Sequence, residues 1–357
     1  MDINAKITGI KYKPFLVTPL KTYKFDREEL SKKRDAKFLL ELDNNQILAI
    51  SKWTSSKRSR SYPLSNVYNI LDYQYRKVTI IPIYKDEGLG GDKDFLEWDI
   101  ISLMSLLGVY TIIAYYLDAV INKRKPNKIT TQVFDYNHIM NEINKLKEYQ
   151  SDALHWNLQQ LDNAAELNIK ALDNYEKISK KLNIKMHSKE YTERRIKELL
   201  KGKEYFIDFS RKLAKGAQQR EIQTIQPKEK LTGEKASITI KNYLGGHYYF
   251  TVDEIEMQNS KLFLIEGKHT KKDMLPTKGD IKEGLVKMLL FTNLEDVKLN
   301  DEIYEIKPVL KLTSIFEFDF NKLSLSRIKM LKLLKEEAIY NKFDVTINDI
   351  NIFDLPL

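Results

Sequence analysis

The sequence predicts an α/β protein with an N-terminal α/β region over residues 1–133, a long helical segment over residues 134–189, and a C-terminal core over residues 190–357 in which a mixed sheet is flanked by helices. Three observations predict this organisation. Short β-branched runs alternate with helix-like stretches in the N-terminal region. The chain has no proline between Pro126 and Pro227, and much of that interval carries apolar residues at helical spacing. After Pro227 the pattern follows the order helix–strand–strand–strand–helix–strand.

In the N-terminal region we expect strands at Lys37 to Asn45 and at Val78 to Tyr84, the second resembling a buried strand. Lys52 to Ser65 is polar and basic, contains Pro63, and is predicted to be a loop. The uncharged run Ile100 to Leu117 approaches the length of a membrane span. We expect instead a helix that ends at Gly108, followed by a buried β-branched strand.

The helical segment contains an a/d heptad pattern that runs over four heptads. Its positions are Leu154, Leu158, Leu161, Ala165, Asn168, Leu172, Tyr175, Ser179 and Leu182. One interpretation is an antiparallel helical hairpin that packs on the protein itself. The other is a contact between two chains, with Asn168 setting the register of a dimer.

The C-terminal core is predicted from apolar runs separated by turn signals. We expect strands at residues 236–243, 245–257, 261–269 and 304–314, a helix from about Asp280 to Thr292, and a last helix over residues 325–343.

Composition excludes several classes of protein. Hydrophobic residues make up 42% of the chain, which excludes wholesale disorder, and the net charge of +9 suits a polyanionic partner. The chain has no cysteine, which excludes disulfide scaffolds, thiolate zinc sites, iron–sulfur clusters and cysteine nucleophiles. Its five histidines lack metal-binding spacing, so a metal is expected to be a hard cation held by carboxylates. The N-terminus lacks a signal-peptide pattern, and a cytoplasmic prokaryotic protein is expected.

The strongest candidates for catalytic residues lie in and opposite the strand Leu262 to Lys268. Glu266 and Lys268 share one face of this strand, at the end of an apolar run, where burying two charges is unfavourable without a purpose. If Asn259 and Ser260 form a two-residue turn, Asp253 lies directly opposite Glu266, with Cβ atoms roughly 4.5–5.5 Å apart. Two carboxylates at that distance repel unless a proton or a cation lies between them, and Mg²⁺ is the natural cation.

Lys268 would then hold or deprotonate a water molecule, or stabilise charge on a phosphate. Two alternatives stay open. A three-residue turn would bring Glu254 opposite Glu266 instead. Glu266 and Lys268 could also form a structural ion pair without catalytic function.

Asp253 on one strand and Glu266-Gly267-Lys268 at the end of the next resemble the PD-(D/E)XK nuclease superfamily, although Val252 stands where many members have proline. The resemblance covers about Glu190 to Ser314. It implies Mg²⁺-dependent hydrolysis of phosphodiester bonds, with Asp253, Glu266 and the Gly267 carbonyl as metal ligands and Lys268 positioning or activating the nucleophile.

Some members of the superfamily add a glutamate from a helix before the first strand. Here the candidates are Glu193, Glu198 and Glu221, on a helix expected over about Glu190 to Glu221. The chain as a whole resembles type II restriction endonucleases.

Basic residues in two places are candidates for DNA contact, because lysine and arginine bind phosphates and arginine also reads guanine edges. The alternative is that both groups are solvated loops. The first group is Lys57, Arg58 and Arg60, and the second is His269, Lys271, Lys272 and Lys278.

An acidic, glycine-rich loop over residues 85–94 fits neither a calcium loop of the EF-hand type nor a phosphate-binding loop. We interpret it as a structural connection, with a second metal site as the alternative.

The function we expect is sequence-specific cleavage of both strands of double-stranded DNA with Mg²⁺, by a type II restriction endonuclease that acts as a homodimer without membrane association. Two alternatives remain open: a DNA repair or recombination nuclease of the same superfamily that recognises DNA structure, and a non-catalytic DNA-binding protein.

Overall fold

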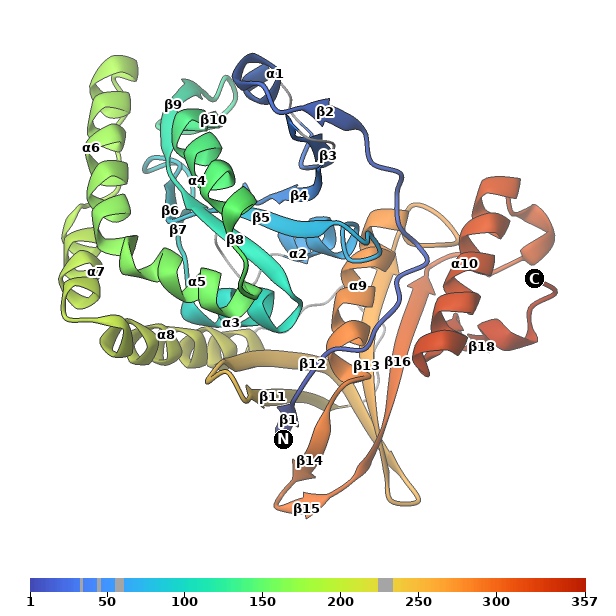
Figure 1. Ribbon diagram of the computed structural model, residues 1–357. Helices are drawn as coiled ribbons and strands as arrows, with labels where there is room; N and C mark the ends of the chain where they lie inside the picture. The colour runs from blue at the N-terminus through green and yellow to red at the C-terminus, as the bar shows by residue number, and fades with distance from the viewer. Residues whose placement is uncertain (33–34, 44–45, 55–60, 224–233) are drawn as a thin grey trace. The chain divides into compact units, whose positions relative to one another are not determined.

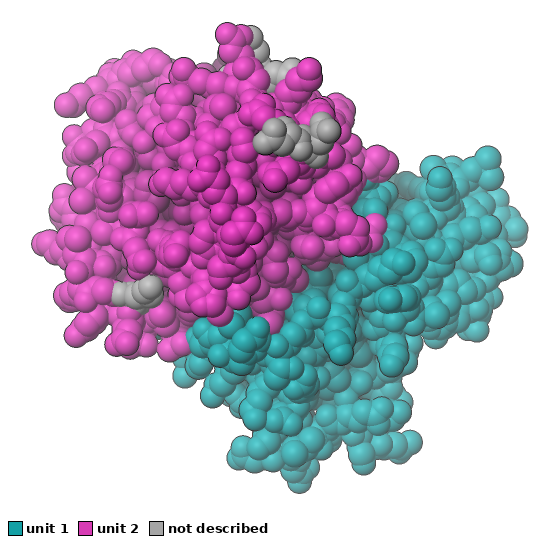
Figure 2. Space-filling model, viewed as in Figure 1, with its two compact units in different colours: residues 1–18, 212–357 teal, residues 19–211 magenta. Residues whose placement is uncertain are grey.

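The computed structural model describes residues 1–32, 35–43, 46–54, 61–223 and 234–357, which form a mixed α/β fold with several sheets flanked by helices (Figure 1). The chain divides into two compact units, residues 1–18 with 212–357 and residues 19–211 (Figure 2). This division differs from the predicted boundaries after residues 133 and 189.

Long-range strand pairing explains part of the difference. The first strand, β1 (Asp2–Ile7), pairs in parallel with β11 (Glu234–Asn242), so that Ile3 lies opposite Ile238. Both side chains are buried. Apolar burial therefore holds the N-terminal residues in the sheet of the C-terminal unit, across more than two hundred intervening positions.

The unit of residues 1–18 and 212–357 is built on one mixed sheet with the strand order β15-β14-β1-β11-β12-β13-β16-β17-β18. The remaining strands are β12 (His247–Gln258), β13 (Lys261–Thr270), β14 (Glu295–Leu299), β15 (Glu302–Ile303), β16 (Glu305–Ser314), β17 (Asp344–Ile347) and β18 (Ile350–Asn351). β11, β12 and β13 pair antiparallel, whereas β16 is parallel to β13.

The helices that connect these strands are α9 (Lys278–Phe291), between β13 and β14, and α10 (Leu325–Asn341), between β16 and β17. α9 begins with a capping box, in which Thr277 and Asp280 satisfy each other's backbone N–H groups. The three predicted strands, the helix that follows them, the strand β16 and the last helix are all present, but a short hairpin of β14 and β15 that was not predicted lies between α9 and β16.

The second unit, residues 19–211, contains a sheet with the strand order β2-β3-β4-β5-β8 and two small antiparallel ribbons, β9-β10 and β6-β7. The strands are β2 (Thr22–Lys24), β3 (Lys37–Glu41), β4 (Ile47–Lys52), β5 (Arg76–Pro82), β6 (Tyr84–Asp86), β7 (Lys93–Phe95), β8 (Val109–Ala114), β9 (Tyr116–Ile121) and β10 (Ile129–Phe134).

Helices surround these strands. They are α1 (Arg27–Lys32), α2 (Ser61–Tyr68), α3 (Trp98–Leu106), α4 (Tyr136–Glu148), α5 (Ala153–Asp162), α6 (Ala164–Leu182), α7 (Glu190–Leu200) and the first part of α8 (Lys203–Gln223). As predicted, Ile100 to Leu117 is a helix followed by buried strand: α3 ends before Gly108, which has a φ of 65°, and β8 begins at Val109. Within the described residues, no helix is long and apolar enough to cross a bilayer.

Three expectations about helices were wrong. The loop predicted over Lys52 to Ser65 gives way to α2 at Ser61, since the first turn of a helix tolerates Pro63. The single helix expected over Glu190 to Glu221 is two helices, α7 and α8, separated at Gly202, whose φ is 122°.

The third concerns the continuous heptad seam, which is interrupted at Asn163 between α5 and α6. The buried face of α6 is Ala164, Leu167, Asn168, Ala171, Tyr175 and Ile178, which shares only part of the predicted seam. α6 packs against β9 of its own unit, and the Asn168 amide donates to the Ala164 carbonyl of its own helix. Elements of the same chain therefore cover the buried face of α6, which agrees with the interpretation that this segment packs on the protein itself.

Candidate active site

The hairpin of β12 and β13 has the turn that the sequence predicts. Asn259 and Ser260 have φ angles of 46° and 66°, the left-handed conformation of a two-residue type I′ turn. Gln258 pairs with Lys261, and the ladder continues to Glu254 opposite Ile265. The predicted register is confirmed as far as this pair, and Asp253 and Glu266 are the next residues on the two strands.

Just beyond the last paired residues of the hairpin, the Asp253 side chain makes a hydrogen bond across the two strands. Its Oδ2 accepts a hydrogen bond of 3.0 Å from the backbone N–H of Gly267. On the other side of β12, the pairing with β11 shifts register between Val252 and Ile255, so the strand is irregular at this residue. A bulge of this kind redirects a side chain at the end of a pairing. Here it accompanies a carboxylate that binds the neighbouring backbone.

Glu266 is a buried carboxylate, only 4% exposed. Its Oε1 lies 2.9 Å from Lys268 Nζ, and its Oε2 lies 3.4 Å from Lys287 Nζ on α9. Burial acts to raise the pKa of Glu266, but the two lysines and Asp253 outweigh it and hold the pKa below its ordinary value. Glu266 is therefore ionised at neutral pH.

Lys268 faces several carboxylates. Burial acts to lower the pKa of Lys268, yet attraction to Glu266, Asp253 and Glu283 raises it above its ordinary value. Lys268 is thus a charged donor at neutral pH, because the acidic surroundings offset its loss of water.

Helix α9 contributes to this cluster because Gly284 lets it approach the sheet. A Cβ atom at Gly284 would lie 2.5 Å from the Leu310 side chain and 3.5 Å from that of Lys268. One turn along the helix, Lys287 donates to the Thr251 carbonyl at 2.7 Å while it pairs with Glu266. Lys287 was not among the predicted site residues, and its i+3 position from Gly284 on the same helix is the signal that could have found it.

Of the three helix glutamates proposed from the resemblance, the structure connects Glu221 to the cluster. Its Oε1 accepts a hydrogen bond of 3.0 Å from the Thr251 hydroxyl. Glu193 and Glu198 lie on α7, in the unit of residues 19–211, and Glu198 pairs there with Lys201. Thr251 thus links Glu221, through its hydroxyl, and Lys287, through its carbonyl.

Glu254 lies on the other face of the hairpin, as the alternation of the strand predicts. It is completely buried and pairs with Lys311 of β16 at 3.3 Å. The unit therefore buries Glu–Lys pairs on both faces of its sheet, and only the face of Glu266 also carries Asp253.

The carboxylates of this cluster are candidate ligands for a divalent cation. Among the described residues, no three His, Cys, Asp or Glu side chains are grouped so that they could hold a metal ion. Asp253 and Glu266 supply a pair of carboxylates, and the buried Oε2 of Glu266 accepts no hydrogen bond from the described residues, although Lys287 Nζ lies 3.4 Å from it. Mg²⁺ commonly binds one or two carboxylates and completes its shell with water and substrate phosphate, so this donor set fits Mg²⁺.

The residues predicted to contact DNA have separate environments. His269 shares a hydrogen bond of 2.9 Å with Thr313, while Lys271 and Lys272 are exposed. Lys278 is also exposed and donates to the Val17 carbonyl at 3.5 Å. The other candidates, Lys57, Arg58 and Arg60, lie outside the described residues.

No protein-family model, curated protein or solved structure matches the chain.

Proposed function

We propose that the protein is a Mg²⁺-dependent DNA endonuclease of the PD-(D/E)XK type. The observation that carries the proposal is the convergence of three side chains at the end of one hairpin. Asp253 binds the backbone of the strand that carries Glu266 and Lys268, and both carboxylates act on the charge of Lys268. A structural ion pair between Glu266 and Lys268 would not need the second carboxylate.

The order of elements supports the proposal. The second half of α8 precedes three antiparallel strands, and α9 then leads, after the short hairpin of β14 and β15, to β16, which is parallel to β13. Apart from that inserted hairpin, this is the helix–strand–strand–strand–helix–strand order expected from the resemblance. The amide of Gln218 on α8 donates to the carbonyls of Ile238 and Phe250, which ties the helix to the first two strands.

Asp253, Glu266 and the Gly267 carbonyl would hold the cation. The Gly267 N–H points to β12, and in an extended strand the carbonyl of the same residue points the same way. A bound Mg²⁺ would supply charge stabilisation and would lower the pKa of a water molecule.

Lys268 would serve as a donor in this reaction. Because the acidic cluster raises its pKa, Lys268 is protonated at neutral pH and is suited to orient a water molecule or to neutralise charge on a phosphate. Lys287 would keep the Glu266 carboxylate in place through its second contact, to the Thr251 carbonyl. These roles favour an electrostatic function for Lys268 over that of a general base.

The proposal extends to a type II restriction endonuclease that recognises a DNA sequence. The net charge of +9 supports a nucleic-acid substrate, and exposed Lys271 and Lys272 follow β13 closely. Cleavage of both strands at a symmetric site would require a homodimer, which sedimentation of the protein with its DNA would detect.

Digestion of a long, sequenced linear DNA tests the proposal. The purified protein is incubated with Mg²⁺ or with EDTA, beside the Asp253→Ala variant. Discrete fragments that need both Mg²⁺ and Asp253 are the expected result, and their ends give the recognition site.

A smear that the variant abolishes would indicate a nonspecific or structure-directed nuclease with the same active site. Cleavage that survives Asp253→Ala, or no cleavage by folded protein on linear, branched or flapped DNA, would contradict the proposal and favour a binding protein.

A further inference from the structure

The unit of residues 19–211 contains a cavity of about 150 Å³ that the proposed nuclease site does not use. Its walls come from β6, β7, α6 and the chain segment that follows α6, so elements far apart in the sequence line it. A cavity of this volume matches one that accommodates a single benzene ring. Its size therefore favours one six-membered ring over a fused bicyclic system.

One wall of the cavity is aromatic. Tyr84 and Tyr175 are both buried, and their ring centroids lie 4.9 Å apart. The Tyr175 hydroxyl is already engaged, because it donates to Gln132 and accepts from the Asp86 N–H. Leu172 and Met186 add apolar surface. These walls suit a flat, unsaturated ring that can stack.

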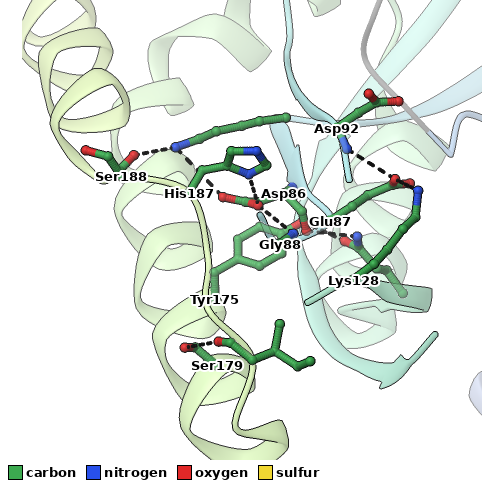
Figure 3. Close-up of polar contacts among 12 residues, drawn as sticks. Asp86, Glu87, Gly88, Asp92, Lys128, Tyr175, Ser179, His187 and Ser188 are labelled. Atoms are coloured by element: carbon green, nitrogen blue, oxygen red, sulfur yellow. Dashed lines mark hydrogen bonds and ion pairs between the residues drawn. The ribbon is translucent and has the colours of Figure 1, made fainter. Parts of the chain in front are cut away.

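A polar pair interrupts the apolar wall. His187 Nδ1 lies 2.7 Å from Asp86 Oδ1, and the same carboxylate oxygen accepts from the Gly88 N–H at 2.8 Å (Figure 3). The Asp86 side chain is only 4% exposed. A carboxylate at this position keeps the proton on Nδ1, so Nε2 is the ring nitrogen that remains for a ligand.

The acidic loop of residues 85–94 explains how this pair is held in place. Gly90 donates to the Asn127 carbonyl and Leu89 to that of Lys185, while Glu87 forms ion pairs with Lys85 and Lys128. The loop is thus a structural connection, as its sequence indicated, and it fixes the position of Asp86.

Lysines also line the cavity. Lys93 Nζ donates to the Ser188 carbonyl at 2.8 Å and lies 3.8 Å from Asp86. Lys189 forms an ion pair with Glu176. The third lysine, Lys180, is exposed. All three lysines lie near carboxylates, and Lys180 acts on Glu176, but Lys180 is exposed and can turn to an anion outside the ring pocket. A phosphate attached to the bound ring would suit this lysine.

We propose that this cavity binds a pyrimidine nucleotide, with its ring against the tyrosines and facing His187 and its phosphate near Lys180. Cytosine carries an amino donor beside a ring-nitrogen acceptor. Because Asp86 keeps the proton on Nδ1, His187 Nε2 accepts, and the amino group of cytosine can donate to it. The inference does not depend on the proposed nuclease site.

Titration of the full-length protein with cytidine monophosphate tests the proposal, with saturation-transfer NMR reporting on the protons of the cytosine ring. We expect Kd values of about 1 mM or tighter. His187→Ala should weaken binding about tenfold, the ratio expected for loss of one hydrogen bond. Leu172→Trp, which fills the cavity, should abolish it. His155→Ala removes an exposed histidine of the same unit and should leave binding unchanged.

Two other ligands test the specificity of the pocket, and the melting temperature of each variant shows whether the variant is folded. Adenosine monophosphate should bind at least about tenfold more weakly, because its base has two fused rings. Equal binding of adenosine monophosphate or of ribose 5-phosphate would overturn the proposal. So would cytidine monophosphate binding that survives both His187→Ala and Leu172→Trp, or its absence in folded wild-type protein.

The nucleotide could be free or part of a DNA strand. Duplexes that carry a fluorescent cytosine analogue distinguish these sources, because the signal rises when a base leaves the stack. A rise that Leu172→Trp removes would assign the pocket to a base of the DNA. A constant signal together with binding of cytidine monophosphate would assign it to the free nucleotide.

Discussion

The backbone N–H of Gly267 donates a hydrogen bond to the Asp253 carboxylate, at a distance of 3.0 Å. The two residues belong to different strands, and the bond forms just beyond the last paired residues of the hairpin, Glu254 and Ile265. The Asp253 carboxylate therefore accepts the hydrogen bond that a backbone carbonyl of β12 would accept if the ladder continued. In doing so it holds Asp253 beside the residue that precedes Gly267, which is Glu266.

Lys268→Ala is predicted to reduce DNA cleavage by about 100-fold or more, because it removes the charged donor beside Glu266. DNA binding, measured by gel shift in Ca²⁺, should change little. The matched control is Lys311→Ala, which breaks the buried pair with Glu254 on the other face of the sheet. Equal loss of cleavage in both variants would indicate a purely structural contribution from Lys268.

Glu221→Gln is predicted to reduce cleavage by about 10–100-fold and to raise the Mg²⁺ concentration needed for half-maximal activity. Glu221 accepts from the Thr251 hydroxyl, and Thr251 binds Lys287, the partner of Glu266. Glu193→Gln is the control. An unchanged Mg²⁺ dependence in Glu221→Gln would exclude Glu221 from the site.

Glu337→Gln is predicted to lower the free energy of unfolding by about 2 kcal/mol, measured by urea denaturation. The buried Glu337 carboxylate accepts hydrogen bonds from the Tyr12 hydroxyl and from the Phe15 and Leu16 N–H groups. An amide at this position places its own N–H₂ group against donors. Glu336→Gln, at the exposed neighbouring position, should change stability by less than about 0.5 kcal/mol.

Because of Lys52, the free energy of unfolding of the protein should change with pH in the alkaline range. Burial lowers the pKa of Lys52 to about 8, with partial compensation by Asp35. The unfolded chain, where lysine has a pKa of about 10.4, binds more protons between these two values, so stability rises with pH in this window. Below pH 8 the lysine is charged in both states, and its contribution is constant.

Comparison of the wild type with Lys52→Met isolates this effect. The free energy of unfolding of the wild type should rise relative to that of the variant by about 3 kcal/mol between pH 7 and pH 10.5. Lys180→Met, at an exposed position of the same unit, is the control. A constant difference between wild type and Lys52→Met would show that the lysine is not desolvated in the folded protein.

Local patterns determined much of the C-terminal fold. The Asn259-Ser260 turn fixed the register of the hairpin, because only a two-residue loop with left-handed φ angles matches the twist of the strands. The same register brought Asp253 beside the strand of Glu266 and separated Glu254 onto the other face. These relationships lie within sixteen residues of sequence, so strand geometry alone could predict them.

Helix boundaries were harder to predict. Apolar spacing along residues 154–182 is compatible with one long seam, yet the chain forms two helices with a break at Asn163. Periodicity predicts which residues share a face, but it does not determine which strand will cover that face. The packing of α6 against β9 selected the buried set.

The sequence by itself determined the mixed α/β class, the hairpin and the pairing of Asp253 with the strand of Glu266 and Lys268. Only the tertiary structure joined β1 to β11, selected Glu221 among the three helix glutamates, added Lys287 to the cluster, and formed the cavity that Tyr84, Tyr175 and His187 line. The physical reason is the difference in sequence range between these two kinds of interaction. Turn preferences and side-chain alternation act over a few residues, whereas these contacts join segments far apart in the chain, and burial of apolar surface is non-directional until the whole chain has packed.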